Sequence, residues 1–287
     1  MNTLPGWRFL HPTDFSEASE VAFAHALKLT LATHGQLHVL HVAPPETGVQ
    51  WKNFPGIRQA LERWGVLPAG SSPEAVGALG IAVEKITAVA SDPVSVTADY
   101  LRRAPADVIV LATHQRDGLD RWRHPSVAQA IARHAGEAAL FVPAGSDGFV
   151  SAATGEMRLR RVLVPLAHAP DPRPAVAAAA ALASLAGEAS VTFRLVHAGH
   201  GEGPDVTPPE QAGWTWDRLT VSGDPAATLI RLIREWTPDL VVMTTEGRHG
   251  FMDALRGSTT EQVLRSAGCP LLAVSTSARA LPRLPRL

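Results

Sequence analysis

The chain has 287 residues, enough for two domains of ordinary size that each bury a hydrophobic core. Hydrophobic residues make up 46% of the sequence and charged residues 18%, a balance that excludes an intrinsically disordered protein. The formal net charge of −1 excludes the basic surface by which proteins bind DNA or RNA without regard to sequence, so we expect no nucleic acid partner.

The sequence also indicates the cellular compartment in which the protein is found. Its single cysteine, Cys269, cannot form a disulfide within the chain, which fits a reducing environment. No apolar run approaches the ~20 residues that span a bilayer, and the N-terminus lacks a basic stretch followed by an apolar one. We therefore expect a cytoplasmic protein that does not enter a membrane.

The first half of the chain alternates between short apolar strands and helices. Helices are expected over Ser16–Thr33 and Pro93–Arg103. Between the second and third strands, Ile57, Leu61 and Trp64 have the spacing of one helical face. Strands are expected near Phe9–Leu10, Leu37–Val42, Ala82–Val89, Val108–Leu111 and Leu140–Val142. Buried strands that alternate with helices predict a parallel sheet covered on both faces, whose ligands bind beyond the carboxyl ends of the strands.

The second half repeats the first. A shift of 132 positions places Asp92–Val142 on Asp224–Val274 without a gap. Earlier in the repeat the offset is larger, and Pro12 then lies on Pro165 and His41 on His197. The second half is shorter after its second strand, where residues 199–213 are rich in glycine and proline and predict no full helix.

The repeat predicts two tandem domains. We assign residues 1–146 to the first copy and residues 158–276 to the second copy. Residues 147–157 form the linker between them, and residues 277–287 a flexible tail.

A loop in the second copy has the features of a phosphate site. It contains Thr244-Thr245-Glu246-Gly247, then nine residues, then Gly257-Ser258-Thr259. The glycines let backbone N–H groups approach a phosphate closely, and Ser258 begins a helix whose unpaired amides attract anions. Glu261, three residues on, completes a capping box. The hydroxyls of Ser258 and Thr259 are further donors, and Arg248 is a nearby positive charge.

This loop and the segment Leu10–Ser16 together resemble the ATP-binding universal stress protein family, in which tandem two-domain members are known. The resemblance implies Rossmann-like five-stranded sheets of order 3-2-1-4-5 with a ligand crevice between the first and fourth strands. It implies ATP or another adenine nucleotide, with Mg²⁺, as ligand, and a contact from Asp14 to the adenosine. It also implies pairing through the fifth strands, Leu140–Val142 and Leu271–Val274, in a homodimer or within one chain.

Each copy departs from the family pattern in a different place. The first copy keeps Asp14 but has Ala112, Gln115 and Pro125 at the glycine positions, followed by Ser126. The second copy keeps two glycines but has Ala167 where Asp14 stands. Because several backbone donors outweigh one carboxylate, we expect nucleotide binding in the second copy. The expected site residues are Asp14, Ser126, Thr244, Gly247, Arg248, Gly257, Ser258 and Thr259.

Three functions remain open from the sequence. The first is a stress-response module that binds a nucleotide and signals without chemistry. The second is a slow ATPase on the same fold, although no Walker lysine motif and no Ser-Gly-Gly-x-Asp loop is present. The third is an interaction scaffold that has lost its ligand.

Several other polar residues have structural explanations. Asp92 and Asp224 each precede a proline, a pattern typical of a helix N-cap. His38 and His41 lie three apart on a strand and point to opposite faces, so they do not chelate one ion. Cys269 is expected to be a buried structural thiol. His11, with His114 and His124, is expected around the crevice of the first copy, where a metal or phosphate role stays open.

Overall fold

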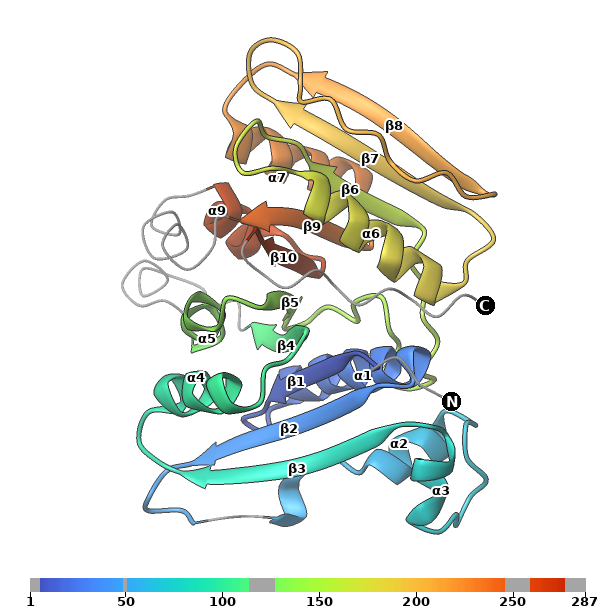
Figure 1. Ribbon diagram of the computed structural model, residues 1–287, viewed down its shortest axis with the longest axis vertical. Helices are drawn as coiled ribbons and strands as arrows, with labels where there is room; N and C mark the ends of the chain where they lie inside the picture. Colours follow the sequence, from blue (N-terminus) through green and yellow to red (C-terminus); the bar gives the residue numbers. More distant parts are fainter. Residues whose placement is uncertain (1–5, 49–50, 114–126, 246–258, 277–287) are drawn as a thin grey trace.

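The computed structural model describes residues 6–48, 51–113, 127–245 and 259–276. Their strands form one ten-stranded sheet of order β3-β2-β1-β4-β5-β10-β9-β6-β7-β8 (Figure 1). The first copy supplies β1 (Arg8–Pro12), β2 (Gln36–Ala43), β3 (Ala82–Val89), β4 (Val108–Thr113) and β5 (Ala138–Pro143). The second copy supplies β6 (Arg161–Pro165), β7 (Val191–Ala198), β8 (Trp214–Val221), β9 (Leu240–Thr245) and β10 (Leu271–Ser275). Each copy therefore has the predicted order 3-2-1-4-5, which confirms the fold class.

All strand pairs are parallel except the pair that joins the copies. β5 and β10 run antiparallel, with Leu140 opposite Leu272. The fifth strands of the two copies thus pair within one chain and occupy each other's edge. The sheet twists strongly, and the carboxyl ends of β2, β3, β7 and β8 point to the same side of the molecule (Figure 1).

Helices cover both faces of this sheet, as a buried parallel sheet requires. The face of α1 (Glu17–Thr33) and α6 (Arg173–Ala186) also carries α2 (Ile57–Arg63) and α3 (Glu74–Ala78) of the first copy. The opposite face carries α4 (Pro93–Arg103), α5 (Val127–Ala135), α7 (Pro225–Trp236) and α9 (Thr259–Ser266). One apolar core lies on each face and runs through both copies.

Two helices begin as the sequence predicts. The Asp92 carboxylate accepts a hydrogen bond from the amide of Val94 at 2.9 Å, and Asp224 accepts one from Ala227 at 2.8 Å. A proline occupies the first turn of both helices. These carboxylates therefore act as N-caps.

The copies differ most after their second strands. In the first copy the segment forms the 3-10 helix η1 (Trp51–Asn53), then α2 and α3, and the expected helical face at Ile57 belongs to α2. In the second copy residues 199–213 contain no helix or strand, as expected. This segment lies against β8 instead, where the Trp216 indole N–H donates to the Pro209 carbonyl at 3.1 Å.

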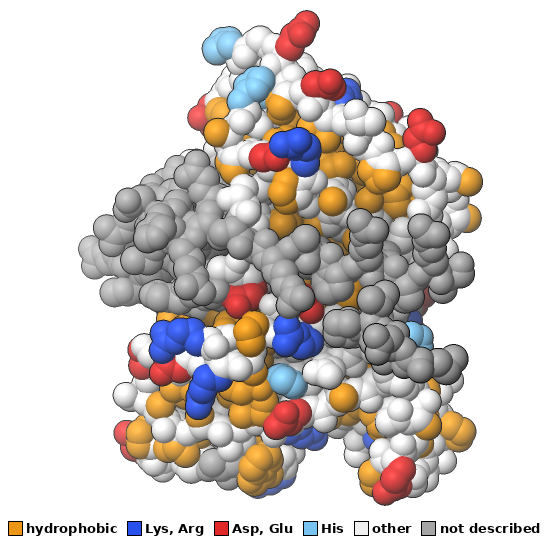
Figure 2. All heavy atoms as spheres, viewed as in Figure 1, with side chains coloured by type: hydrophobic (Ala, Val, Ile, Leu, Met, Phe, Trp, Pro, Cys, Tyr) orange, Lys and Arg blue, Asp and Glu red, His pale blue; other side chains and the backbone are white. Residues whose placement is uncertain are grey.

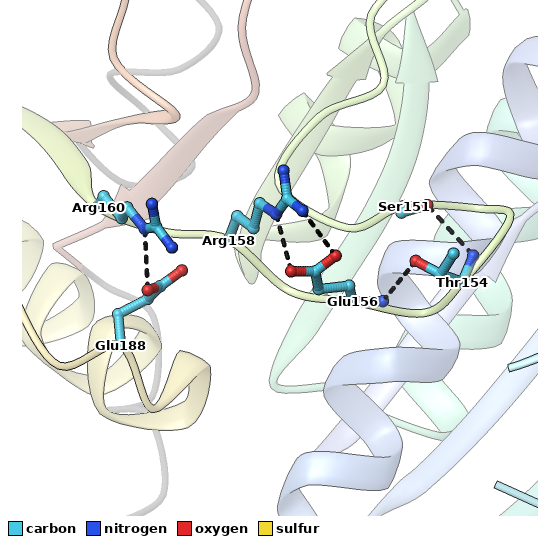
Figure 3. Close-up of polar contacts among 6 residues, drawn as sticks. All are labelled: Ser151, Thr154, Glu156, Arg158, Arg160 and Glu188. Atoms are coloured by element: carbon cyan, nitrogen blue, oxygen red, sulfur yellow. Dashed lines mark hydrogen bonds and ion pairs between the residues drawn. The ribbon is translucent and has the colours of Figure 1, made fainter. Parts of the chain in front are cut away.

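The linker is folded onto the first copy. Phe149 and Val150 are fully buried, and their amides donate to the His25 Nε2 atom at 3.1 and 3.2 Å. The Trp64 indole N–H, at the end of α2, donates to the Ala152 carbonyl at 3.0 Å. The rest of the linker is a polar hairpin closed by a hydrogen bond from the Ser151 amide to the Glu156 carbonyl at 3.0 Å, next to a Glu156–Arg158 ion pair (Figure 3). The segment inserted in the first copy thus helps to hold the connection between the copies.

The surface carries no dominant charge on the face that Figure 2 shows, where basic and acidic side chains are scattered over both copies. No helix of the described residues is long and apolar enough to cross a membrane.

Candidate functional site

The candidate site lies at the carboxyl ends of β6, β7 and β9 in the second copy. β6 pairs with both neighbours, with Pro165 opposite Val196 and Leu163 opposite Val241. The same register, continued beyond the end of β6, places Leu166 between His197 of β7 and Thr244 of β9. Side chains in one row across a parallel sheet point to the same face, so His197 and Thr244 flank Leu166 on the α6 face.

His197 is buried and has a defined tautomer. Its Nδ1 atom lies 3.0 Å from the Leu166 carbonyl oxygen, which can only accept, so Nδ1 carries the proton. Its Nε2 atom is therefore a bare acceptor. That atom is buried and has no hydrogen-bond partner in the described structure.

Two hydroxyls at the end of β9 are also without a partner. The Oγ1 atoms of Thr244 and Thr245 are buried and make no hydrogen bond. Thr245 follows Thr244 on the strand and so faces the α9 side of the sheet. Leaving a buried polar group unpaired costs about 1–3 kcal/mol, so three such groups at one sheet edge need an explanation.

The cover over His197 is built from glycines and one exposed histidine. A Cβ atom on Gly203 would lie 2.7 Å from the His197 Cβ, so only glycine allows this approach of the backbone. The His168 ring lies across the edge of His197, with ring centroids 5.5 Å apart and an interplanar angle of 70°. His168 Nε2 donates to the Glu202 carbonyl at 3.1 Å. His168 therefore links β6 to the glycine-rich segment after β7.

The equivalent site of the first copy is filled by its own side chains. His41 makes the same backbone contact, from Nδ1 to the Thr13 carbonyl at 2.9 Å. The Phe15 ring stacks on His41 at 4.0 Å between centroids, and Phe54 packs against Phe15 at 5.2 Å. Phe15 adopts a φ of 62°, a strained conformation for a bulky residue. None of the buried unpaired polar atoms of the described structure belongs to this strand end.

Asp14 lies in the turn after β1 and is exposed. Its Oδ1 atom accepts hydrogen bonds from the Ser16 amide at 3.0 Å and the Ser16 hydroxyl at 2.6 Å. Ser16 in turn caps α1. In this structure Asp14 thus shapes the entry into α1.

The structure describes only some of the other predicted site residues. Thr244 is the second-to-last residue of β9, and Thr259 is the half-buried first residue of α9. Ser126, Gly247, Arg248, Gly257 and Ser258 lie outside the described residues, as do His114 and His124. The phosphate loop and its capping serine therefore stay predictions. Glu261 is buried in α9 and pairs with Arg265.

His11 does not line the crevice, contrary to the expectation for it. It is buried in the core, with Nδ1 2.9 Å from the Val110 carbonyl and Nε2 3.4 Å from the Ser19 hydroxyl. Burial lowers its pKa to about 4, so it is neutral. Its strand position points it inward, where it has a structural role.

The two strand histidines and the cysteine have the structural roles that the sequence predicted. His38 Nδ1 lies 2.7 Å from the Tyr100 hydroxyl, whereas His41 bonds to Thr13, so the two histidines contact groups on opposite faces of the sheet. Within the described ranges no group of three metal-ligating side chains comes together. Cys269 is half-buried, and desolvation raises its pKa to about 12, which makes the thiol unreactive.

Sequence reasoning missed His168 and assigned no role to His197. The available signal was a histidine at the end of an apolar strand that leads directly into a glycine-rich run, His197-Ala198-Gly199-His200. A glycine-rich run there lets a backbone or a ligand approach closely.

Solved structures that cover most of this chain support the fold. A universal stress protein from Archaeoglobus fulgidus DSM 4304 superimposes with a TM-score of 0.60 at 17% identity, over 93% of this chain and 96% of its own. A protein of unknown function from Pseudomonas aeruginosa PAO1 gives a TM-score of 0.59 at 13% identity, over 94% and 92% of the two chains. A universal stress protein solved in complex with cAMP matches 49% of this chain and 98% of its own, at 19% identity and a TM-score of 0.36.

No curated protein sequence gave a significant match. The profile of the Universal stress protein family matches residues 8–143 and 207–275, one segment in each copy. Because these segments cover more than half of its length, the chain belongs to the universal stress protein family.

Proposed function

We propose that the protein binds an adenine nucleotide, ATP or a close relative with Mg²⁺, in its second copy and acts as a binding module in a stress response. One observation carries the proposal: the buried hydroxyls of Thr244 and Thr245, at the carboxyl end of β9, have no hydrogen-bond partner among the described residues. The order of the strands reverses there, between β6 and β9, which is where open α/β sheets bind ligands.

The energetics favour a ligand over a packing role. A buried threonine hydroxyl without a partner is worse for stability than the methyl group of valine, which has the same shape. At a purely structural position valine would therefore serve better. A bound ligand that offers acceptors removes the penalty. The two hydroxyls are thus explained by a ligand-bound state.

The first copy is proposed to be the weaker site. Its strand end has Ala112 in place of Thr244, and Phe15 and Phe54 fill the space beside His41. Asp14 is present but is already bonded to Ser16. The first copy therefore keeps the carboxylate of Asp14 but lacks the other groups that a nucleotide site needs.

Occupancy, not turnover, is the proposed mechanism. The ligand would stabilise the segments that close over the crevice and so change the surface that a partner meets. The paired β5 and β10 leave no free fifth-strand edge, so we infer that one tandem chain takes the place of a homodimer.

The test compares nucleotide binding in four variants by titration calorimetry and thermal unfolding. Thr244→Val and Thr245→Val should each weaken ATP binding by roughly 10-fold and raise the melting temperature of the ligand-free protein. Thr113→Val, at the first-copy position that matches Thr245, should leave affinity unchanged. Gly257→Pro, in the predicted phosphate loop, should abolish binding, because proline removes a donor and fixes φ.

The outcomes separate the three functions. Bound ATP without hydrolysis supports the module, and hydrolysis that Thr245→Val abolishes supports an ATPase. No binding at millimolar nucleotide leaves the interaction scaffold. Equal ATP affinity in Gly257→Pro and the parent protein would refute the assignment of the loop.

A further inference from the structure

The bare Nε2 atom of His197 restricts what a ligand can present to it. Because Nδ1 donates its proton to the Leu166 carbonyl, Nε2 can accept a hydrogen bond but cannot donate one. The atom is buried and unpaired. Only a ligand with an N–H or O–H group satisfies it.

Building on the proposed nucleotide site, we propose that His197 selects the base of the ligand by accepting a hydrogen bond from an exocyclic amino group. The second copy would therefore prefer a 6-aminopurine over a 6-oxopurine. This assigns a specificity residue to the second copy.

The position of His197 in the sheet suits the base rather than the phosphates. Thr244 lies two strands from His197, across Leu166, a separation of ~10 Å at the usual strand spacing. α9 begins at Thr259 after β9 and packs on the face opposite Thr244, so a nucleotide that reaches both elements passes beyond the strand ends. A nucleotide with its phosphates near the start of α9 would extend toward β7 by about the length of a nucleoside. Its base would then lie over the end of β6, beside His197.

The same position explains how the second copy manages without a carboxylate. Ala167 occupies the place of Asp14 and offers no polar group. His197, on the neighbouring strand, supplies an acceptor at the same edge of the sheet. In the first copy the matching histidine, His41, stacks under Phe15 instead. The acceptor has thus moved from the turn after the first strand to the end of the second strand.

The cover over Nε2 consists of groups that can move. His168 is exposed, and its ring is held by its bond to the Glu202 carbonyl and by its contact with the His197 ring. A Cβ atom on Gly199 would lie 3.5 Å from His197 Nε2, an ordinary van der Waals distance, so the Gly199 backbone lies near the acceptor without crowding it. A base that takes the place of the His168 ring would reach Nε2 without disturbing the sheet.

The experiment compares ATP with ITP, in which a carbonyl oxygen replaces the 6-amino group. Two acceptors would then face each other in a buried site, which costs far more than a lost contact. The parent protein should bind ATP at least ~10-fold more tightly than ITP. His168→Ala should keep this preference, since His168 only covers the acceptor.

Two substitutions separate recognition from folding. His197→Gln places an amide oxygen near the former Nε2 position and should keep the preference for ATP. His197→Asn can still donate to the Leu166 carbonyl but has no acceptor at Nε2, so it should bind ATP and ITP alike. His41→Asn makes the matching change in the first copy and should leave the preference intact.

Different results would overturn the proposed nucleotide binding and the proposed role of His197. If the parent protein binds ATP and ITP equally, nucleotide binding stands and the role of His197 is overturned, with Nε2 bonded to water only. If His197→Asn keeps the ATP preference, another residue reads the base. If neither nucleotide binds at millimolar concentration, the proposed function itself is overturned.

Discussion

The two copies place the same histidine at the same strand end and use it differently. His41 and His197 both donate from Nδ1 to the backbone carbonyl that follows the first strand of their copy, at 2.9 and 3.0 Å. That bond is the common structural role. The surroundings of the two rings differ. Phe15 stacks on the His41 ring, whereas the Nε2 atom of His197 is a buried acceptor without a hydrogen-bond partner in the described part of the chain. The two copies thus share a structural contact and differ in whether the second ring nitrogen is left as a buried atom without a partner.

The copies also cover the α1 and α6 face of their outer strands in different ways. The first copy uses α2, whose capping residue Trp64 bonds to the linker. The second copy uses a segment rich in glycine and proline, held by Trp216. The first copy therefore uses this cover to stabilise the connection between the copies, whereas the second copy covers its outer strands with a segment that has no helix or strand.

The largest expected difference between the copies is their response to acid. His11 and His25, both in the first copy, are fully buried, and burial lowers the pKa of each to about 4. For His11, the charge of Asp14 opposes this shift only in part. Val164 and Ala178 occupy the matching positions of the second copy. The acid-labile core thus belongs to the first copy.

The sign of the effect follows from the lowered pKa values. Between pH 6.5 and 4 the unfolded chain binds protons at these two histidines while the folded chain does not. Stability is therefore complete above pH 6.5 and falls as the pH drops to 4, by about 3 kcal/mol for each histidine. Urea unfolding at steps across this range measures the loss. His11→Val should remove roughly half of it, and a flat profile in the parent protein would contradict the prediction.

A smaller effect is expected from the insertion that holds the linker. Trp64→Ala removes the bond to the Ala152 carbonyl and the packing against Gly155, and should destabilise the protein by about 3 kcal/mol. Trp51 provides the control, since it belongs to the same insertion but is 58% exposed, and Trp51→Ala should cost little. Chemical unfolding followed by circular dichroism compares the two. Equal losses would show that the insertion does not hold the linker through Trp64.

Local sequence patterns predicted the features that depend on residues close together in the chain. The alternation of apolar runs and helices predicted the order of the elements, and the repeat predicted two five-stranded units of the same topology, which the structure joins into one sheet. Positions such as Asp92 were predictable because a cap depends on neighbours in the chain. The orphan acceptor of His197 was not, because it depends on which carbonyl the ring meets across the sheet. The burial of His11 likewise required knowing which way β1 faces.

Where the local sequence repeats, the two copies should respond alike. Asp92→Ala and Asp224→Ala each remove one N-cap in front of a proline, and each should cost about 1 kcal/mol. Asparagine at either position retains a capping oxygen and should restore most of the loss. The free energy of unfolding in urea measures both. A large difference between the two variants would mean that one carboxylate has a role beyond capping.

The smallest effect on stability is expected at the Glu156–Arg158 ion pair of the linker (Figure 3). Arg158 and Glu156 meet at 2.8 and 2.9 Å, but their side chains are 66% and 53% exposed, so water screens their attraction. Arg158→Ala should therefore leave the melting temperature unchanged within about 1 °C at physiological salt. The linker is held by buried groups, Phe149 and Val150 against His25. A clear drop in the melting temperature of Arg158→Ala would instead assign that role to the exposed hairpin.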